Sequence, residues 1–232
     1  MGEQVGLIRI SQEHETSAQA ETFGPFHLTY AYARSAEGQS ADQPGQDYIV
    51  WRTEGSRLVF ALCDGVSQSF YGELAARFLG DALVDWLWQL PLSDKDAAGP
   101  ATLLTEQLSA WTAAATGLVQ EQILPPGIPE MQRVALEQKR ALGSQSMFVA
   151  GRIDLPDASL PRGRLLCCWL GDCRLRAWRG NVEEPRLSIG RDTAQRWSTR
   201  TGAVGGTVCV LSSGVKGRTY LAAAGESSLF SG

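Results

Sequence analysis

The order of segment types along the chain is the feature that most restricts its fold. Residues 71–90 carry apolar side chains at helical spacing, and Pro91 ends that pattern. Two further helical patterns cover residues 104–118 and 129–142. These helices stand between two groups of strand-like segments and do not alternate with them. The order disfavours a doubly wound parallel sheet and predicts an α+β fold, a β-sandwich of mostly antiparallel sheets with helices packed outside.

The strand-like segments are short apolar runs bounded by turn-forming residues. They cover residues 26–33, 47–51, 58–63, 146–153, 164–170, 174–178 and 208–211. The RTEGS sequence between the second and third runs predicts a hairpin. Residues 1–22 are polar and aperiodic, so we expect a loose N-terminal leader followed by a single domain over residues 23–232.

Composition excludes several classes of partner. The 232 residues include 21 Lys and Arg against 25 Asp and Glu, which gives a formal net charge of −4. With no basic run, the chain lacks the electrostatic footprint of a nucleic-acid-binding protein. The apolar runs are of strand length, far below the roughly 20 residues of a membrane-spanning helix. We therefore expect neither nucleic acid nor a membrane as partner.

Cysteine usage bears on the compartment. The chain has five cysteines, and four of them lie in or beside apolar, strand-like runs. None has zinc-ligand spacing with histidine, because His14 and His27 both lie near the N-terminus. This pattern predicts reduced thiols in the core and a cytoplasmic protein.

The sharpest local motif is FALCDGVSQS, in which an apolar run leads directly into Asp64 and Gly65. A carboxylate fixed at a strand end is a good ligand for a hard metal ion. The glycine lets the next carbonyl turn toward the same ion. Taken alone, the Asp-Gly pair is equally consistent with an ordinary turn.

A second motif, GQD, places Asp47 at the start of the strand that should pair with residues 58–63. If the hairpin forms, Asp47 comes close to Asp64. Two carboxylates at one sheet edge repel each other unless a cation or water separates them. The pair therefore predicts either a divalent cation site or two carboxylates separated by water.

A third motif, WLGDCRLRAW, puts Asp172 between two strand-like runs. Gly171 and Asp172 leave room for no more than a tight turn between these runs. By itself the motif predicts a hairpin with an aspartate in its turn.

Taken in order, GQD, FALCDGVSQS with the following helix, GSQSMFVAGRI and WLGDCRLRAWRG resemble the type 2C, metal-dependent protein Ser/Thr phosphatases, particularly their bacterial branch. Each motif is weak, but the ordered set covers roughly residues 25–211. The resemblance implies a β-sandwich in α-β-β-α layers. It also implies hydrolysis of phosphoserine or phosphothreonine by a water that Mn²⁺ or Mg²⁺ ions activate.

The resemblance assigns roles to individual residues. Asp64 would bridge two ions, the Gly65 carbonyl would bind one of them, and Asp47 would hold a metal-bound water, so Asp47 and Asp64 are the expected catalytic residues. Asp172 matches an acid linked to a weaker third metal site. The phosphate-binding residue stays unassigned, because the nearest arginine upstream of Asp47 is Arg34. The expected partner is a phosphoprotein substrate or a signalling kinase.

The C-terminal part departs from the family pattern. In the best local match Ser213 stands where the family has a metal-binding aspartate, and an alternative placement puts that motif at residues 223–227, near Glu226. Glu226 is the only acidic residue after Asp192. A hydroxyl cannot supply the charge of a carboxylate to a divalent ion, so one ion should bind weakly. Either the chain is a truncated form or it is a degenerate phosphatase.

Three hypotheses remain open from the sequence. The chain is a Mn²⁺- or Mg²⁺-dependent phosphatase, or a pseudophosphatase that binds a kinase or phosphoprotein, or an unrelated α+β protein. Side-by-side placement of Asp47 and Asp64 beside two stacked sheets would argue against the third.

Overall fold

The computed structural model describes residues 6–91, 99–183, 193–205, 208–213 and 219–224. The helices are α1 (Ala36–Ser40), α2 (Gly72–Gln89), α3 (Gly99–Ala110), α4 (Thr112–Glu121) and α5 (Glu130–Leu142). The first seven strands are β1 (Gly6–Arg9), β2 (Thr16–Phe23), β3 (Phe26–Tyr32), β4 (Tyr48–Glu54), β5 (Arg57–Gly65), β6 (Gln145–Asp154) and β7 (Arg164–Leu170). The others are β8 (Arg174–Arg179), β9 (Val182–Glu183), β10 (Arg196–Ser198), β11 (Gly202–Val204), β12 (Val208–Ser213) and β13 (Thr219–Ala224).

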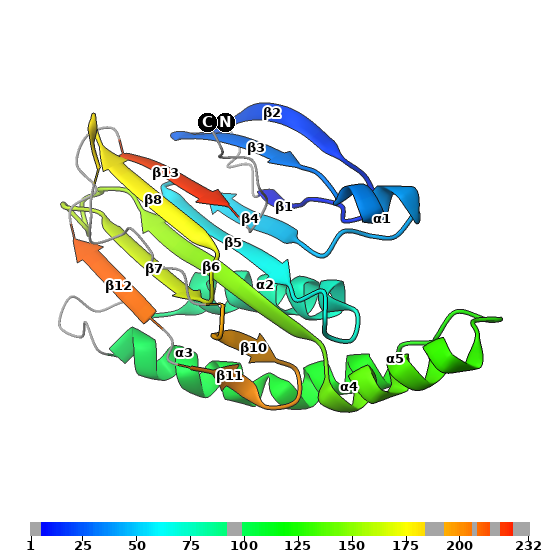
Figure 1. Cartoon of the computed structure of the whole chain (residues 1–232). Helices are drawn as coiled ribbons and strands as arrows, with labels where there is room; N and C mark the ends of the chain where they lie inside the picture. Colours follow the sequence, from blue (N-terminus) through cyan, green and yellow to red (C-terminus); the bar gives the residue numbers. More distant parts are fainter. Residues whose placement is uncertain (1–5, 92–98, 184–192, 206–207, 214–218, 225–232) are drawn as a thin grey trace.

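One large antiparallel sheet organises the molecule (Figure 1). It contains eight strands in the order β1-β4-β5-β6-β10-β11, and β7 pairs with β6 and carries β12 on its other side. Two small sheets, β13-β8-β9 and the hairpin β2-β3, stand apart from it. The α+β class and the antiparallel pairing agree with the sequence prediction.

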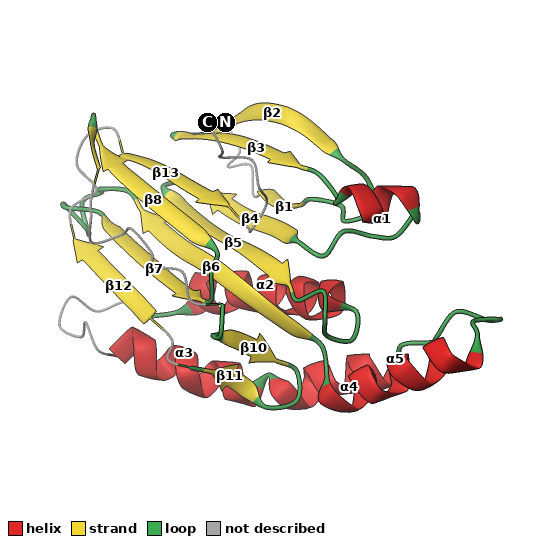
Figure 2. Cartoon of the chain, in the orientation of Figure 1, coloured by secondary structure: helices red, strands yellow, loops and turns green. Residues whose placement is uncertain are grey.

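The layers differ from the expected α-β-β-α arrangement. Helices α2, α3 and α4 lie along one face of the large sheet, and the small sheets lie over its other face (Figure 2). Within the described residues, only the five-residue α1 stands on the side of the small sheets. The described part of the chain is therefore an α-β-β arrangement with the second β layer divided in two.

Both faces of the central strands are covered, which explains their unbroken apolar sequences. In β5, Val59, Ala61 and Cys63 join the core on the helix side, whereas Leu58 and Leu62 join the core under the small sheets. Side chains alternate between the faces of a strand. A strand buried on both faces therefore needs apolar residues at successive positions.

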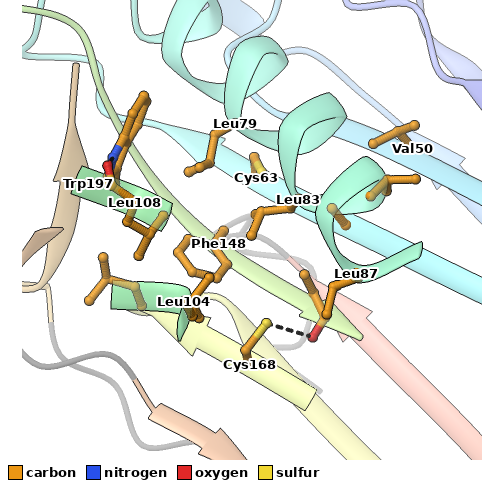
Figure 3. Close-up of a cluster of buried hydrophobic side chains, with 14 of the residues drawn as sticks. Val50, Cys63, Leu79, Leu83, Leu87, Leu104, Leu108, Phe148, Cys168 and Trp197 are labelled. Atoms are coloured by element: carbon orange, nitrogen blue, oxygen red, sulfur yellow. Dashed lines mark hydrogen bonds between the residues drawn. The ribbon is translucent and has the colours of Figure 1, made fainter. Parts of the chain in front are cut away.

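The helix-side core fixes α2 on the large sheet. Leu79, Leu83 and Leu87 are fully buried on one face of α2 and lie above Phe148 and Cys63 of the sheet (Figure 3). Helical spacing of three and four residues brings such side chains onto one stripe. This packing holds the start of α2 close to the end of β5.

The sequence predicted a loose leader over residues 1–22, and the described part of this segment corrects that prediction because it contains two strands. Strand β1 pairs with β4 at the edge of the large sheet, with Leu7 opposite Arg52. Strand β2 pairs with β3 as a hairpin. The polar composition of β2 hid that strand, because β2 is exposed along most of its length and shows no apolar periodicity. Strand β1 has only four residues, too few for a clear pattern.

The thiols agree with the expected core positions. Cys63, Cys167, Cys168 and Cys173 are all buried. The cytoplasmic assignment remains a prediction. None of the helices in the described ranges combines the length and the apolar character required to cross a bilayer.

Candidate functional site

The pairing of β4 with β5 brings Asp47 and Asp64 together. Tyr48 is the partner of Cys63, so the residues just beyond that pair, Asp47 and Asp64, face each other. Both side chains point to the face opposite Tyr48 and Cys63, because orientation alternates along a strand. A hydrogen bond joins the two carboxyl groups. The placement that the hairpin motif predicted is therefore present.

Close backbone packing fixes the turn after Asp64. A β-carbon on Gly65 would lie 2.5 Å from the Gly72 carbonyl carbon and 2.7 Å from the Gln46 carbonyl oxygen. Only glycine fits where three chain segments approach so closely. The Ser146 hydroxyl also donates to the Asp64 carbonyl oxygen at 2.9 Å. The backbone at Asp64 and Gly65 is thus held by β6 and by the start of α2.

The GSQS sequence, expected only as a strand start, holds the beginning of α2. The buried Ser144 hydroxyl donates to the Tyr71 carbonyl oxygen at 2.8 Å and accepts from the Ala75 amide at 3.1 Å. Helix N-termini leave backbone amides without intrahelical partners, and a hydroxyl supplies one. Tyr71 itself has a left-handed backbone, with φ of 43°. Ser144 therefore stabilises the unusual turn that leads from the site into α2.

Asp172 does not lie in a hairpin, which corrects the sequence prediction. Strand β7 belongs to the large sheet and β8 to a small one, so residues 171–173 cross from one sheet to the other. Gly171 has φ of +100°, a conformation that favours glycine. A β-carbon there would lie 2.5 Å from the Met147 side chain. The crossover places Asp172 between the sheets, where it is 4% exposed.

Three acidic groups now share one small region. The pKa of Asp47 is raised to about 8. Burial is the largest cause, and the charge of Asp64, the hydrogen bond to Asp64 and the charge of Asp172 add to it in that order. Oxygen atoms of Asp64 and Asp172 and the sulfur of Cys173 all lie within 4.8 Å of one another. The sequence motifs identified the three aspartates. They did not identify Cys173, although it follows Asp172 directly.

The acids open onto a cleft of about 2190 Å³ between the large sheet, the β2–β3 hairpin and β13. Asp47, Asp64 and Asp172 line it, and so does Arg34. Among the described residues of this lining, Arg34 is the only arginine or lysine. The cleft therefore combines an acidic end with the positively charged guanidinium of Arg34.

Arg34 is held in place by hydrogen bonds to two neighbouring residues. Its Nε donates to Glu15 Oε1 at 2.8 Å and its Nη1 donates to the Gln43 carbonyl oxygen at 3.1 Å. The guanidinium lowers the pKa of Glu15 to about 2. Arg34 was the nearest upstream arginine in the sequence, and its place beside Gly45 in space makes it the candidate for anion binding.

The donor set of the site suits a divalent cation. Carboxylate oxygens are the preferred ligands of Mg²⁺ and Mn²⁺. Carboxylates that repel each other in a buried position are relieved by a positive ion between them. Asp64, Asp172 and the carbonyl of Gly65 come from rigid or tightly packed backbone, so these residues fit the expected ion. Their roles as ligands and the catalytic role of Asp47 remain predictions.

Ser213, the position that the family resemblance aligns with a metal-binding aspartate, does not lie at this site. In β12, Val208 pairs with Trp169 and Ser213 pairs with Arg164. Ser213 is therefore at the opposite end of β7 from Asp172, which argues against its equivalence to a metal-binding aspartate. Glu226 lies outside the described residues.

The comparisons with known proteins show distant similarity. No protein-family model and no curated protein matches the chain. A crystal structure of a bacterial serine phosphatase with a single substitution is 12% identical, with a TM-score of 0.42, and the match covers 91% of this chain and 72% of that one. A bacterial serine phosphatase without a stated substitution is 13% identical, with a TM-score of 0.37 over 67% of this chain and 62% of that one.

Proposed function

We propose that the chain is a metal-dependent phosphoprotein phosphatase that hydrolyses phosphoserine or phosphothreonine. The observation that supports this most directly is the convergence of Asp47, Asp64 and Asp172 at a cleft that also contains Arg34. Acidic side chains hold divalent cations, and a guanidinium binds a phosphate dianion. The order of the motifs along the sequence, which resembles the type 2C phosphatases, supports the same function.

The residues of the site have two kinds of proposed role, as metal ligands and as residues that bind the attacking water or the substrate. Asp64 and Asp172, with the Gly65 carbonyl, would hold Mn²⁺ or Mg²⁺, which supplies Lewis-acid activation of water and of the phosphoryl oxygens. Asp47, opposite Asp64, would accept a hydrogen bond from the attacking water and orient it.

Arg34 would bind the phosphate group of the substrate. Glu15 accepts hydrogen bonds from its Nε and Nη2 atoms and fixes its orientation. A guanidinium already fixed in place loses less conformational entropy when it binds an anion. The cleft beside it is open enough for an extended segment of a phosphoprotein. We expect no nucleic acid and no membrane among the partners.

A second candidate is a pseudophosphatase that binds a kinase or a phosphoprotein without hydrolysis. The specific observation in its favour is the scarcity of acids in the C-terminal part, where Glu226 alone follows Asp192. Without further carboxylates, a second cation would be weakly held. The two candidates share the fold and the cleft and differ only in turnover.

The test is hydrolysis of a phosphothreonine peptide with Mn²⁺, Mg²⁺ or chelator, using the wild type, Asp64→Asn and the control Asp85→Asn. Asp85 is exposed on α2 and lies outside the acidic cluster. Turnover that requires the metal and Asp64, but not Asp85, would support the phosphatase. Binding of the phosphopeptide without turnover would support the pseudophosphatase.

A further inference from the structure

The acidic cluster contains one donor of a different chemical kind. The sulfur of Cys173 and carboxylate oxygens of Asp64 and Asp172 lie within 4.8 Å of one another. Oxygen-only sites suit Mg²⁺ and Mn²⁺, whereas a thiolate is a soft ligand that these ions do not favour. The sulfur therefore changes which cation this corner of the site should prefer.

The three donors are held by neighbouring backbone contacts. Asp64 of β5 pairs with Met147 of β6, and Gly171 lies against the Met147 side chain. This stacking sets the crossover, with Asp172 and Cys173, directly beside Asp64. Cys173 is 1% exposed and packs in the core under the small sheets. The donors are thus positioned by packing and not by mobile loops.

A cation can reach this position from the cleft. Asp64 and Asp172 both line it, whereas Cys173 is not part of its lining. An entering ion would meet the two carboxylates first and the sulfur behind them. An entry path and a defined set of donors are the minimum requirements for a metal site.

Zinc is the biological cation that matches this donor set. It binds thiolates at about 2.3 Å and carboxylates at about 2.0–2.2 Å in tetrahedral geometry, which requires donor separations of roughly 3.4–3.8 Å. The three donor atoms lie within 4.8 Å of one another, so a shift of about 1 Å or less brings them into that range. Three protein ligands leave a fourth position for water, as in other zinc sites of this kind.

We propose that Asp64, Asp172 and Cys173 form a zinc site. The site does not depend on phosphatase activity. A regulatory consequence rests on the proposed function: because Asp64 serves both arrangements, Zn²⁺ bound to Cys173 would displace Mn²⁺ and inhibit hydrolysis.

Cobalt(II) tests the site without reference to activity. Co²⁺ occupies zinc sites, and a coordinating thiolate gives an intense near-ultraviolet charge-transfer band. The full chain, reduced and free of metal, would be titrated with Co²⁺ alone and then with Zn²⁺. We expect the band to saturate at one equivalent per chain and to disappear when Zn²⁺ is added.

Variants separate the sulfur from the carboxylates. Cys173→Ser should lose the band, and Asp172→Asn should weaken Co²⁺ binding at least about tenfold, the minimum expected for loss of a ligand. Cys168→Ala is the matched control, because Cys168 is equally buried but bonds to the Ala150 carbonyl oxygen, outside the cluster. Circular dichroism would establish that each variant is folded.

Two results would overturn the zinc site. One is a folded wild type that gives no thiolate band with Co²⁺, and the other is a band that persists in Cys173→Ser. A failure of the phosphatase proposal gives a different result. A chain that shows the Co²⁺ band but hydrolyses no phosphopeptide has the zinc site without the activity. Relief of Zn²⁺ inhibition in Cys173→Ser would support the regulatory consequence.

Discussion

The carboxyl groups of Asp47 and Asp64 share a hydrogen bond, although Asp47 directly precedes β4 and Asp64 belongs to β5. Burial and the charge of Asp64 raise the pKa of Asp47 well above its ordinary value. Two buried carboxylates cannot both ionise without mutual repulsion. The metal-free site is therefore a source of instability that a bound cation would relieve, as expected for residues selected for binding and not for stability.

Replacing Asp47 with Asn should stabilise the metal-free protein at about pH 8. The pKa of Asp47 is higher in the folded state than in the unfolded state, where it is near 4. Its contribution to the free energy of unfolding is therefore fully present below about pH 4. It is lost as the pH rises toward about 8. We expect the Tm of Asp47→Asn at about pH 8 to exceed that of the wild type by about 2–8 °C, equivalent to about 1–2 kcal/mol. Calorimetry at about pH 4 should show little difference.

The exposed Asp85→Asn is the control for that measurement, because its carboxylate lies outside the cluster. An equal change in Tm for Asp47→Asn at both pH values would mean that repulsion in the cluster is not the cause. Addition of Mn²⁺ at about pH 8 should raise the Tm of the wild type and leave that of Asp64→Asn unchanged.

Gly65→Ala should destabilise the fold. The added methyl group would meet backbone atoms of Gly72 and Gln46 at 2.5–2.7 Å, and backbone cannot move aside as a flexible side chain can. We expect a loss of about 1–3 kcal/mol in urea unfolding. In the control, Gly117→Ala, the new methyl group on α4 meets nothing within 4 Å. Alanine there should stabilise by about 0.5–1 kcal/mol. Similar losses at both sites would refute the proposed close packing.

Ser144→Ala should loosen the start of α2. The variant removes a hydroxyl that is fully buried and makes two hydrogen bonds, to the Tyr71 carbonyl and from the Ala75 amide. A buried backbone group left without its partner costs about 1–3 kcal/mol. Urea unfolding measures this loss, and hydrogen exchange at Ala75 should accelerate. The exposed Ser17→Ala in β2 serves as control, and unchanged exchange at Ala75 would contradict the capping role.

Arg34→Ala should weaken phosphopeptide binding without changing the acidic cluster. Hydrogen bonds to a charged group contribute about 1.5–3 kcal/mol, so KM should rise roughly 10- to 100-fold with a smaller change in kcat. Arg34→Lys should restore only part of the loss, because lysine cannot form the paired contacts of a guanidinium. The exposed Arg133→Ala on α5 is the control. An unchanged KM in Arg34→Ala would remove Arg34 from the phosphate site.

The central hairpin could be predicted from sequence because its determinants are local. The RTEGS turn and the apolar runs beside it set the register of β4 and β5. That register, with the two-residue period of strands, places Asp47 and Asp64 opposite each other on one face. The helix α2 follows equally from its apolar spacing and from Pro91.

Tertiary structure decided what local pattern could not. Whether the chain after Leu170 turns back in the same sheet or crosses to another depends on which surface the next strand buries. The apolar runs on both sides of Gly171 fit either outcome. The crossover, and with it the contact of Asp172 and Cys173 with Asp64, follows from packing against Met147, which is distant in sequence. Strand β1 likewise forms because the edge of β4 offers free backbone groups, and its four residues are too few for a clear strand pattern. The sequence by itself pointed to the three aspartates of the candidate site and to the pairing of Asp47 with Asp64, because that pairing depends on one local hairpin. The contacts of Asp172, Cys173 and Arg34 were decided by long-range packing.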